Sequence, residues 1–209
     1  MVIRSFEELG KSVMDRSPRL GDIRVVAVDG RSGSGKTTFA ARLAIERARA
    51  GIDVALVHTD DLLGGWGHPT NFGPYLRQWI INPLAAGGEG RYRIYDWITR
   101  QFSTDWCHIG RPELLILEGV TAASAQWRPL LSTGVLLTAD SQECLRRGIA
   151  RDGEELRAEL EKWRRHEDDH YAGDHTDGHV DMIVDGNPTE SHDPDTQFVV
   201  IECLSTPTG

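Results

Sequence analysis

The chain has 209 residues, of which 39% are hydrophobic and 26% are charged, which is typical of one globular domain and excludes a disordered chain. Its 32 acidic and 23 basic side chains give a formal net charge of −9, which disfavours general nucleic-acid binding because that function usually needs a basic surface. The three cysteines show no C-x-x-C spacing, so neither a disulfide framework nor a zinc ribbon is expected.

Neither a membrane span nor a signal peptide is expected from the apolar runs of the sequence. The longest purely aliphatic run covers residues 114–117, which is far short of a membrane span. Arg4, Glu7 and Glu8 come before any apolar core develops, unlike the start of a signal peptide. We therefore expect a cytoplasmic protein with no membrane partner and no nucleic-acid partner.

The first elements have clear boundary signals. Ser5 and Glu8 have the spacing of a capping box, so a helix should begin there. Residues 23–28 form a continuous apolar run rich in β-branched side chains, as in a strand buried on both faces. A helix is expected over about 36–50, and Gly51 should end it as a C-terminal cap.

The rest of the chain repeats this alternation of apolar runs and helical segments. Residues 54–57 predict a second buried strand, and much of 75–86 predicts a helix that is interrupted near Pro83. Residues 141–171 predict a helix broken near Gly153. The remaining strands are expected at 114–117, 135–138, 182–184 and 198–201.

Strands that alternate with helices and lack polar alternation predict a parallel sheet covered by helices on both faces. The fold class is therefore α/β, a three-layer sandwich with a parallel central sheet. A single domain should span residues 1–209, because the sequence shows no internal repeat and its length suits one domain.

The strongest motif is the segment 30–37, GRSGSGKT, which matches G-x-x-x-x-G-K-[ST] between an expected strand and an expected helix. Phosphates must approach backbone N–H groups closely in such a loop, so glycines are needed, and the helix N-terminus adds a favourable dipole. Lys36 should reach the β- and γ-phosphates, and Thr37 should hold Mg²⁺. The expected ATP-binding residues are Gly30, Ser32, Gly33, Ser34, Gly35, Lys36, Thr37 and Thr38.

Two adjacent acids follow the second expected strand. Ligands bind beyond the carboxyl ends of strands in open α/β sheets, so Asp60 or Asp61 could accept a proton from a hydroxyl that attacks the γ-phosphate. Both are equally compatible with a helix cap or a loop position. Glu118, after the apolar run 114–117, resembles the acid that orients Mg²⁺ through water.

Arginines are dense after the fourth expected strand. Arg147 and Arg151 are four residues apart and share a helical face, from which they could stabilise charge during phosphoryl transfer. A solvated helix surface is the simpler interpretation for Arg164 and Arg165. His166 and His170 could form a metal pair, but this stretch resembles exposed helix without convergent ligands, so no metal is expected there.

The P-loop and its flanks, VDGRSGSGKTT at 28–38, resemble the uridine kinase-like branch of P-loop kinases, which includes pantothenate kinase and phosphoribulokinase. Further segments resemble this branch in the same order along the chain. They are TDDL at 59–62, YDWITR at 95–100, LEGV at 117–120 and RRGIARD at 146–152.

The resemblance covers about residues 23–188 and implies a fold with five parallel strands and a mobile helical lid over about 141–175. It implies that Asp60 is the catalytic base, and that Lys36, Arg147 and Arg151 are also catalytic. It implies substrate contacts from Asp60, Tyr95, Trp97 and Arg100, and Mg²⁺ held by Thr37 and, through water, by Glu118.

Two features depart from the family pattern. The lid arginines are spaced by four where the family has three, and Arg100 stands where uridine kinases have histidine. A buried arginine needs an anion nearby. Asp96 could supply it if the segment is helical, and this structural pair is the simpler expectation. Otherwise the anion belongs to the acceptor, which then carries a carboxylate or phosphate.

The expected reaction is transfer of the γ-phosphate of ATP, with Mg²⁺, to a hydroxyl of a small molecule. A nucleoside such as uridine or cytidine is the leading acceptor by resemblance, and a pantothenate-type or sugar-type alcohol is the alternative. A nucleotide-binding switch is the non-enzymatic alternative. The sequence leaves the acceptor, the phosphate donor and a homo-oligomeric state open.

Overall fold

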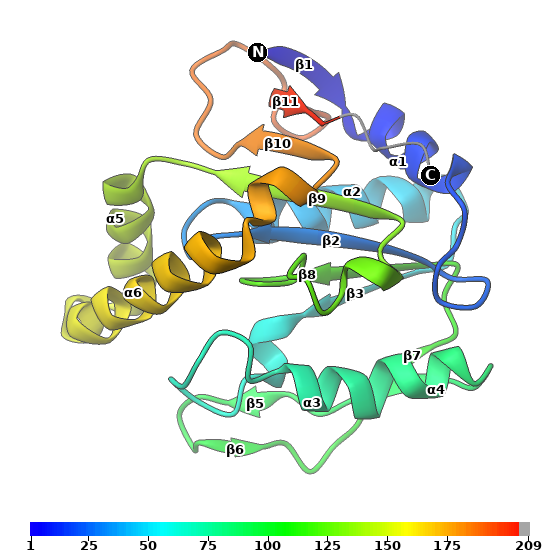
Figure 1. Cartoon of the computed structure of the whole chain (residues 1–209), viewed down its shortest axis with the longest axis horizontal. Coiled ribbons are helices and arrows are strands. Elements are labelled where there is room, and N and C mark those ends of the chain that lie inside the picture. The colour runs from blue at the N-terminus through cyan, green and yellow to red at the C-terminus, as the bar shows by residue number, and fades with distance from the viewer. Residues whose placement is uncertain (205–209) are drawn as a thin grey trace.

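A mixed sheet of seven strands runs through the protein between two layers of helices in the computed structural model, which describes residues 1–204 (Figure 1). Across the sheet the strands are β1 (Val2–Ser5), β11 (Gln197–Cys203), β10 (Met182–Asp185), β9 (Thr133–Thr138), β2 (Arg24–Gly30), β8 (Leu114–Glu118) and β3 (Val54–His58).

Five of these strands, from β10 to β3, are parallel, as the sequence predicted. The sheet is nevertheless wider than five strands. The expected strand near 198–201 is β11, which runs antiparallel to β10, and β1 adds to its far side, also antiparallel. No strand was expected at β1, because four residues give too short a pattern to be read without their distant partner.

One face of the sheet is covered by α1 (Phe6–Asp15) and α2 (Lys36–Arg49). The predicted capping box is confirmed, since Ser5 accepts from the Glu8 amide and the Glu8 carboxylate accepts from the Ser5 amide. The rings of Phe6, Phe39 and Phe198 have centroids 5.0–5.1 Å apart and join both helices to β11.

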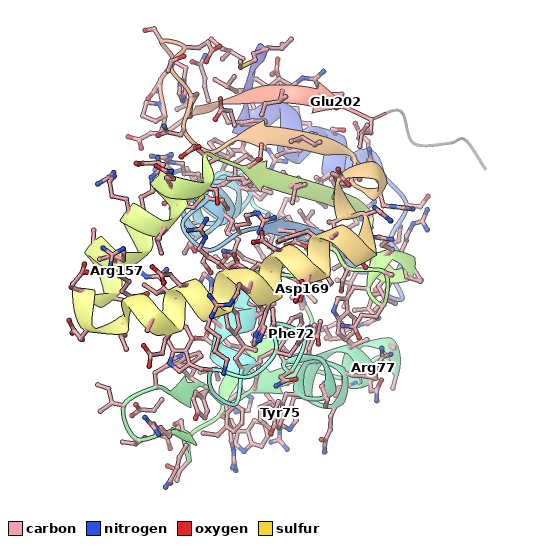
Figure 2. The ribbon with its side chains drawn as sticks, turned by 60° about the vertical axis from the view of Figure 1, so that its left-hand side comes forward. Phe72, Tyr75, Arg77, Arg157, Asp169 and Glu202 are labelled. Carbon is pink, nitrogen blue, oxygen red and sulfur yellow. The ribbon has the colours of Figure 1, made fainter. Side chains whose placement is uncertain are left out.

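The other face is covered by the helical segment 73–85 and by α6 (Arg157–Asp174), which follows α5 (Ser141–Asp152). The break near Gly153 is confirmed, and its φ of +103° explains why helix ends there. Figure 2 places Phe72 beneath α6, where its ring stacks on Trp127 at 6.0 Å. Among the described residues, no helix is both long and apolar enough to cross a membrane.

The expected interruption at Pro83 takes a different form. Helix runs without a break through α3 (Gly73–Leu76), a π-helical turn (Arg77–Ile81) and α4 (Asn82–Ala85). Proline has no N–H to donate and its ring crowds the preceding turn, so widening that turn to i→i−5 bonding lets the helix continue. The Asn82 amide donates to Arg77 O in this widened turn.

Two small two-stranded antiparallel sheets come between α4 and β8 in the chain. They are β4 (Gly90–Tyr92) with β7 (Cys107–Gly110), and β5 (Tyr95–Asp96) with β6 (Gln101–Phe102). Short 3₁₀ turns complete the described structure, at Thr59–Leu62, Arg128–Leu130, Glu154–Leu156 and Thr176–His179.

Candidate active site

The glycine-rich loop lies where β2 ends and α2 begins. Gly33 has φ +82°, and a Cβ there would lie 2.3 Å from the Cys144 carbonyl oxygen, so only glycine fits. Lys36 is 6% exposed, and its ammonium donates to the Arg31 carbonyl at 3.3 Å inside the loop. This is the cradle that phosphates need. Thr38 is exposed on the first turn of α2.

Glu118 and Thr37 come together as the motif predicts. The Thr37 hydroxyl donates to Glu118 Oε1 at 3.2 Å, and Glu118 is 4% exposed at the end of β8. Burial works to raise the pKa of Glu118, but the hydrogen bond from His58 and the charge of Lys36 outweigh it and lower the pKa. An ionised carboxylate beside a hydroxyl at the phosphate loop is a donor set that suits Mg²⁺.

His58 belongs to this site, although the sequence interpretation missed it. Its Nδ1 is hydrogen-bonded to Glu118 Oε2, because β3 and β8 are parallel neighbours with His58 opposite Glu118. That hydrogen bond raises the pKa of His58. The available signal was positional, since both residues end adjacent strands at the carboxyl edge of the sheet.

Asp60 and Asp61 point to different surroundings. Asp60, in the 3₁₀ turn after β3, lines a large cavity beside the P-loop. Asp60 is exposed to this open cavity, and the protein packed around it partly desolvates the carboxylate, which raises its pKa. Asp61 instead accepts a hydrogen bond from Tyr92, and burial together with Asp61 raises the pKa of Tyr92 to about 12.

Four aromatic side chains, together with aliphatic and charged ones, line this cavity, whose volume is about 880 Å³. Trp66 packs against Trp97 at 5.3 Å and Trp163 at 5.9 Å between ring centroids, and Tyr95 packs against Trp97 at 5.3 Å. The cavity also reaches Ser32 of the P-loop. The predicted substrate residues Asp60, Tyr95, Trp97 and Arg100 therefore share one space with the phosphate loop.

The predicted pair between Asp96 and Arg100 is wrong. The segment is a hairpin, and Asp96 Oδ1 accepts from the amides of Ile98 and Thr99 at 2.8 and 3.0 Å, which closes the turn. Arg100 lies after this turn with φ +57° and lines the cavity. An aspartate that caps its own turn has no helical neighbour four residues on, which removes the expected geometry.

The two lid arginines have different surroundings. Arg151 lines the cavity, where it interacts electrostatically with Asp60 and Glu118. Arg147 instead lies against the outer side of the P-loop, where its Nη1 donates to Gly33 O at 3.2 Å and to Gly186 O at 3.0 Å. Among the described residues only Arg151 of this pair borders the cavity, while Arg147 braces the loop backbone.

The C-terminal half of α6 is anchored to the loop by side chains that sequence reasoning missed. Glu167 is fully buried, and its Oε1 accepts from the Ser32 amide at 2.9 Å and the Ser32 hydroxyl at 2.7 Å. Arg31 forms an ion pair with Asp168. In an Arg- and Glu-rich helix these acids resembled a solvated face, and only the packing against the P-loop buries Glu167.

Asp29 ties the same helix to the sheet. It is fully buried and accepts from the Tyr171 hydroxyl at 2.7 Å and from the amides of Gly30, Thr121 and Ala123 at 2.6–2.9 Å. Burial raises the pKa of Asp29, which is the first residue outside the phosphate loop. These hydrogen bonds fix the C-terminal half of α6, at Tyr171, to the end of β2.

The histidines near the lid are not arranged as a metal site. His68 stacks on His166 with centroids 5.8 Å apart, but among residues 1–204 no group of three or more His, Cys, Asp or Glu side chains could hold a metal ion.

Arg151→Ala should lower kcat by about tenfold or more with little change in ATP affinity, because Arg151 borders the cavity rather than the loop backbone. Arg147→Ala should weaken ATP binding, since Arg147 donates to the Gly33 carbonyl of the loop. Identical kinetic profiles for the two variants would contradict these separate roles.

Protease cleavage within 146–166 should slow when ATP and acceptor are both present. Equal cleavage rates with and without ligands would contradict closure of this segment over the site.

Gly119→Ala should destabilise the fold by at least about 2 kcal/mol. Gly119 follows Glu118 with φ +151°, and a Cβ there would lie 1.8 Å from the hydroxyl oxygen of Thr59, a stiff and buried side chain. The free energy of unfolding in urea measures the effect. Gly173→Ala, on α6 with no atom within 4 Å of the new Cβ, is the matched control and should be neutral or slightly stabilising.

Comparison with known proteins gives structural matches only. A scan of protein-family models finds no match, and a search of curated proteins finds none. A solved structure described as a possible uridine kinase from Bacillus stearothermophilus superposes with a TM-score of 0.64 at 21% identity, over 85% of this chain and 96% of that one. A solved structure described as a proposed fructose transport system kinase from Silicibacter sp. TM1040 superposes with a TM-score of 0.61 at 20% identity, over 79% of this chain and 95% of that one. The chain therefore has the α/β fold of P-loop kinases.

Proposed function

We propose that the protein is a small-molecule kinase that transfers the γ-phosphate of ATP, with Mg²⁺, to an acceptor hydroxyl. The observation that carries this proposal is the position of Asp60, a carboxyl group of raised pKa in a cavity that adjoins the phosphate loop. Its neighbours include the charges of Lys36 and Arg151. A base, a phosphate cradle and a cation beside one cavity are the parts that phosphoryl transfer needs.

The residues present fit ATP and Mg²⁺. Lys36 and the amides of residues 33–37 would hold the phosphates, and the Thr37 hydroxyl with Glu118 would hold the metal, directly and through water. When bound, these groups supply the phosphoryl group and a positive charge beside it. Asp60 would accept the proton of the acceptor hydroxyl, and Arg151 would stabilise the charge that develops.

The walls of the cavity suit an acceptor with a flat or apolar body. Trp66, Trp97 and Trp163 present rings and ring edges to it, on which a planar group can pack. A nucleoside is accordingly the leading acceptor, in line with the resemblance of 95–100 to the substrate segment of uridine kinases. Pantothenate-type and sugar-type alcohols are the alternatives.

The test is a screen of the purified protein for ADP release with nucleosides, vitamins and sugar phosphates. We expect ATP turnover that depends on one acceptor class and is lost in Asp60→Asn. Tight ATP binding with slow hydrolysis that no added alcohol accelerates would support a nucleotide-binding switch and refute the kinase.

A further inference from the structure

We propose that Arg100 selects the acceptor, and that the acceptor carries an anionic group, a carboxylate or a phosphate, in addition to the hydroxyl that is phosphorylated. This inference rests on the proposed function, because it takes the aromatic-walled cavity as the acceptor site. It adds what that function leaves open, which is the charge of the substrate.

The backbone does not explain an arginine at position 100. Its φ of +57° is one that glycine or asparagine adopts at lower free energy. The turn before it is closed by Asp96, which accepts from two amides, so the Arg100 side chain is not needed to form the hairpin. A long charged side chain on a residue with an unfavourable backbone angle points to a role for the side chain itself.

Arg100 is also the unpaired cation of the cavity. Within residues 1–204, its guanidinium makes no ion pair and no hydrogen bond, although it lines the cavity. The other cation of the lining, Arg151, has two hydrogen bonds of 2.7 Å to Asp152. The phosphate-loop cation, Lys36, donates to Arg31 O.

The chemistry of the site favours an anion as the partner of Arg100. A guanidinium offers a rigid fork that matches the two oxygens of a carboxylate or phosphate. Arg100 is exposed in this structure, and Tyr95 and Trp97 of the same hairpin line the cavity with it. Closure over a ligand would remove water from this part of the cavity and make an unpaired charge there unfavourable. A neutral acceptor would leave Arg100 in that state, whereas an anionic acceptor would pair with it.

Three acids line the cavity, of which Asp60 is the proposed base and Asp152 is paired with Arg151, so Glu159 is the alternative partner of the guanidinium when the lid closes. Glu159 lines the same cavity from α6 and, in the described part of the chain, has no ion pair. In that case Arg100 would be a latch between the hairpin and the lid, and the acceptor charge would be irrelevant. The experiment must therefore separate acceptor recognition from a latch.

The experiment compares acceptors in pairs that differ by one anionic group, with the kcat/KM of ADP release as the readout. The pairs are uridine with orotidine, panthenol with pantothenate, and ribose with ribose 5-phosphate, so that carboxylate and phosphate are distinguished. Binding of each probe is measured in parallel by tryptophan fluorescence, because three tryptophans line the cavity. That readout does not depend on turnover.

The wild-type protein should prefer the anionic member of at least one pair by about tenfold or more. Arg100→Asn, which tolerates the positive φ, should lose about 10- to 100-fold for that anionic member and change little for its neutral partner. Arg100→Lys should restore part of the loss. Arg157→Asn removes an arginine from the outer tip of the lid and should leave the preference unchanged (Figure 2).

Three outcomes overturn the proposal. These are preference for the neutral member in every pair, an anionic preference that persists in Arg100→Asn, and an equal loss in Glu159→Gln, which would identify the latch. The proposed function fails separately. If no probe supports ADP release but an anionic probe binds in an Arg100-dependent way, the recognition role of Arg100 is supported and the kinase function is refuted. If only neutral acceptors are turned over, the kinase function is supported and the role of Arg100 in selecting the acceptor is refuted.

Discussion

We expect Asp60→Asn to lower kcat by about 100-fold or more while ATP still binds, because the amide cannot accept the proton of the acceptor hydroxyl. Asp60 faces the cavity beside the phosphate loop, whereas Asp61 accepts a hydrogen bond from Tyr92 and faces away from that cavity. Asp61→Asn is therefore the matched control and should have a much smaller effect on kcat. The opposite ranking in steady-state kinetics would assign the base to Asp61.

The same substitution should raise thermal stability at neutral pH. Burial raises the pKa of Asp60 above its unfolded value, so the fold favours the protonated carboxyl. That stabilisation is present below the unfolded pKa and is lost as pH rises through the folded pKa, which leaves an unfavourable, partly desolvated charge at pH 7. The asparagine side chain of the variant carries no charge, so Tm at pH 7 should rise and the difference from wild type should shrink toward pH 3.

The raised pKa also predicts the pH profile of the reaction. A base must be ionised to accept a proton, so kcat/KM should fall on the acid side at a pH above the ordinary range of an aspartate. A profile that stays flat down to that ordinary range would contradict Asp60 as the group that titrates.

Lys36→Ala should reduce phosphoryl transfer by at least about 100- to 1,000-fold, the loss typical of removing one group that stabilises transition-state charge. Lys36 is buried in the phosphate loop, where, among residues 1–204, it donates only to the Arg31 carbonyl, so the variant should keep its fold. Turnover, ATP binding and the far-UV circular dichroism spectrum measure these effects. Lys11→Ala, which removes an exposed lysine paired with Glu7, is the control and should behave as wild type.

Local signals were sufficient for much of the fold. The capping box at Ser5, the C-terminal glycine at 51 and the P-loop each depend on neighbouring residues, and all are present in the structure. The five parallel strands also follow from continuous apolar runs. The elements that were missed, β1 and the two hairpins, are short and take their identity from partners elsewhere in the chain.

In the site, too, the features set by neighbouring residues were predictable and those set by distant partners were not. Lys36, Thr37 and Glu118 were predictable because a motif fixes the first two and a strand end fixes the third. The environment of Arg100 was not predictable, because the helix assumed for 95–100 is a turn that Asp96 closes. The role of Glu167 was not predictable either, because a glutamate in a charged helix can be recognised as buried only once the helix is seen to pack on Ser32.

The pairing of β1 with β11 has a consequence for synthesis. Val2 is opposite Val200, so the partner of the first strand is translated about 200 residues later. At roughly 5–20 residues per second, β1 waits on the order of 10–40 seconds. During that time the side chains of Val2 and Ile3, exposed even in the finished fold, belong to an unpaired strand that can add to another nascent chain. Ribosome-bound intermediates lacking β11 should therefore be the species that chaperones retain.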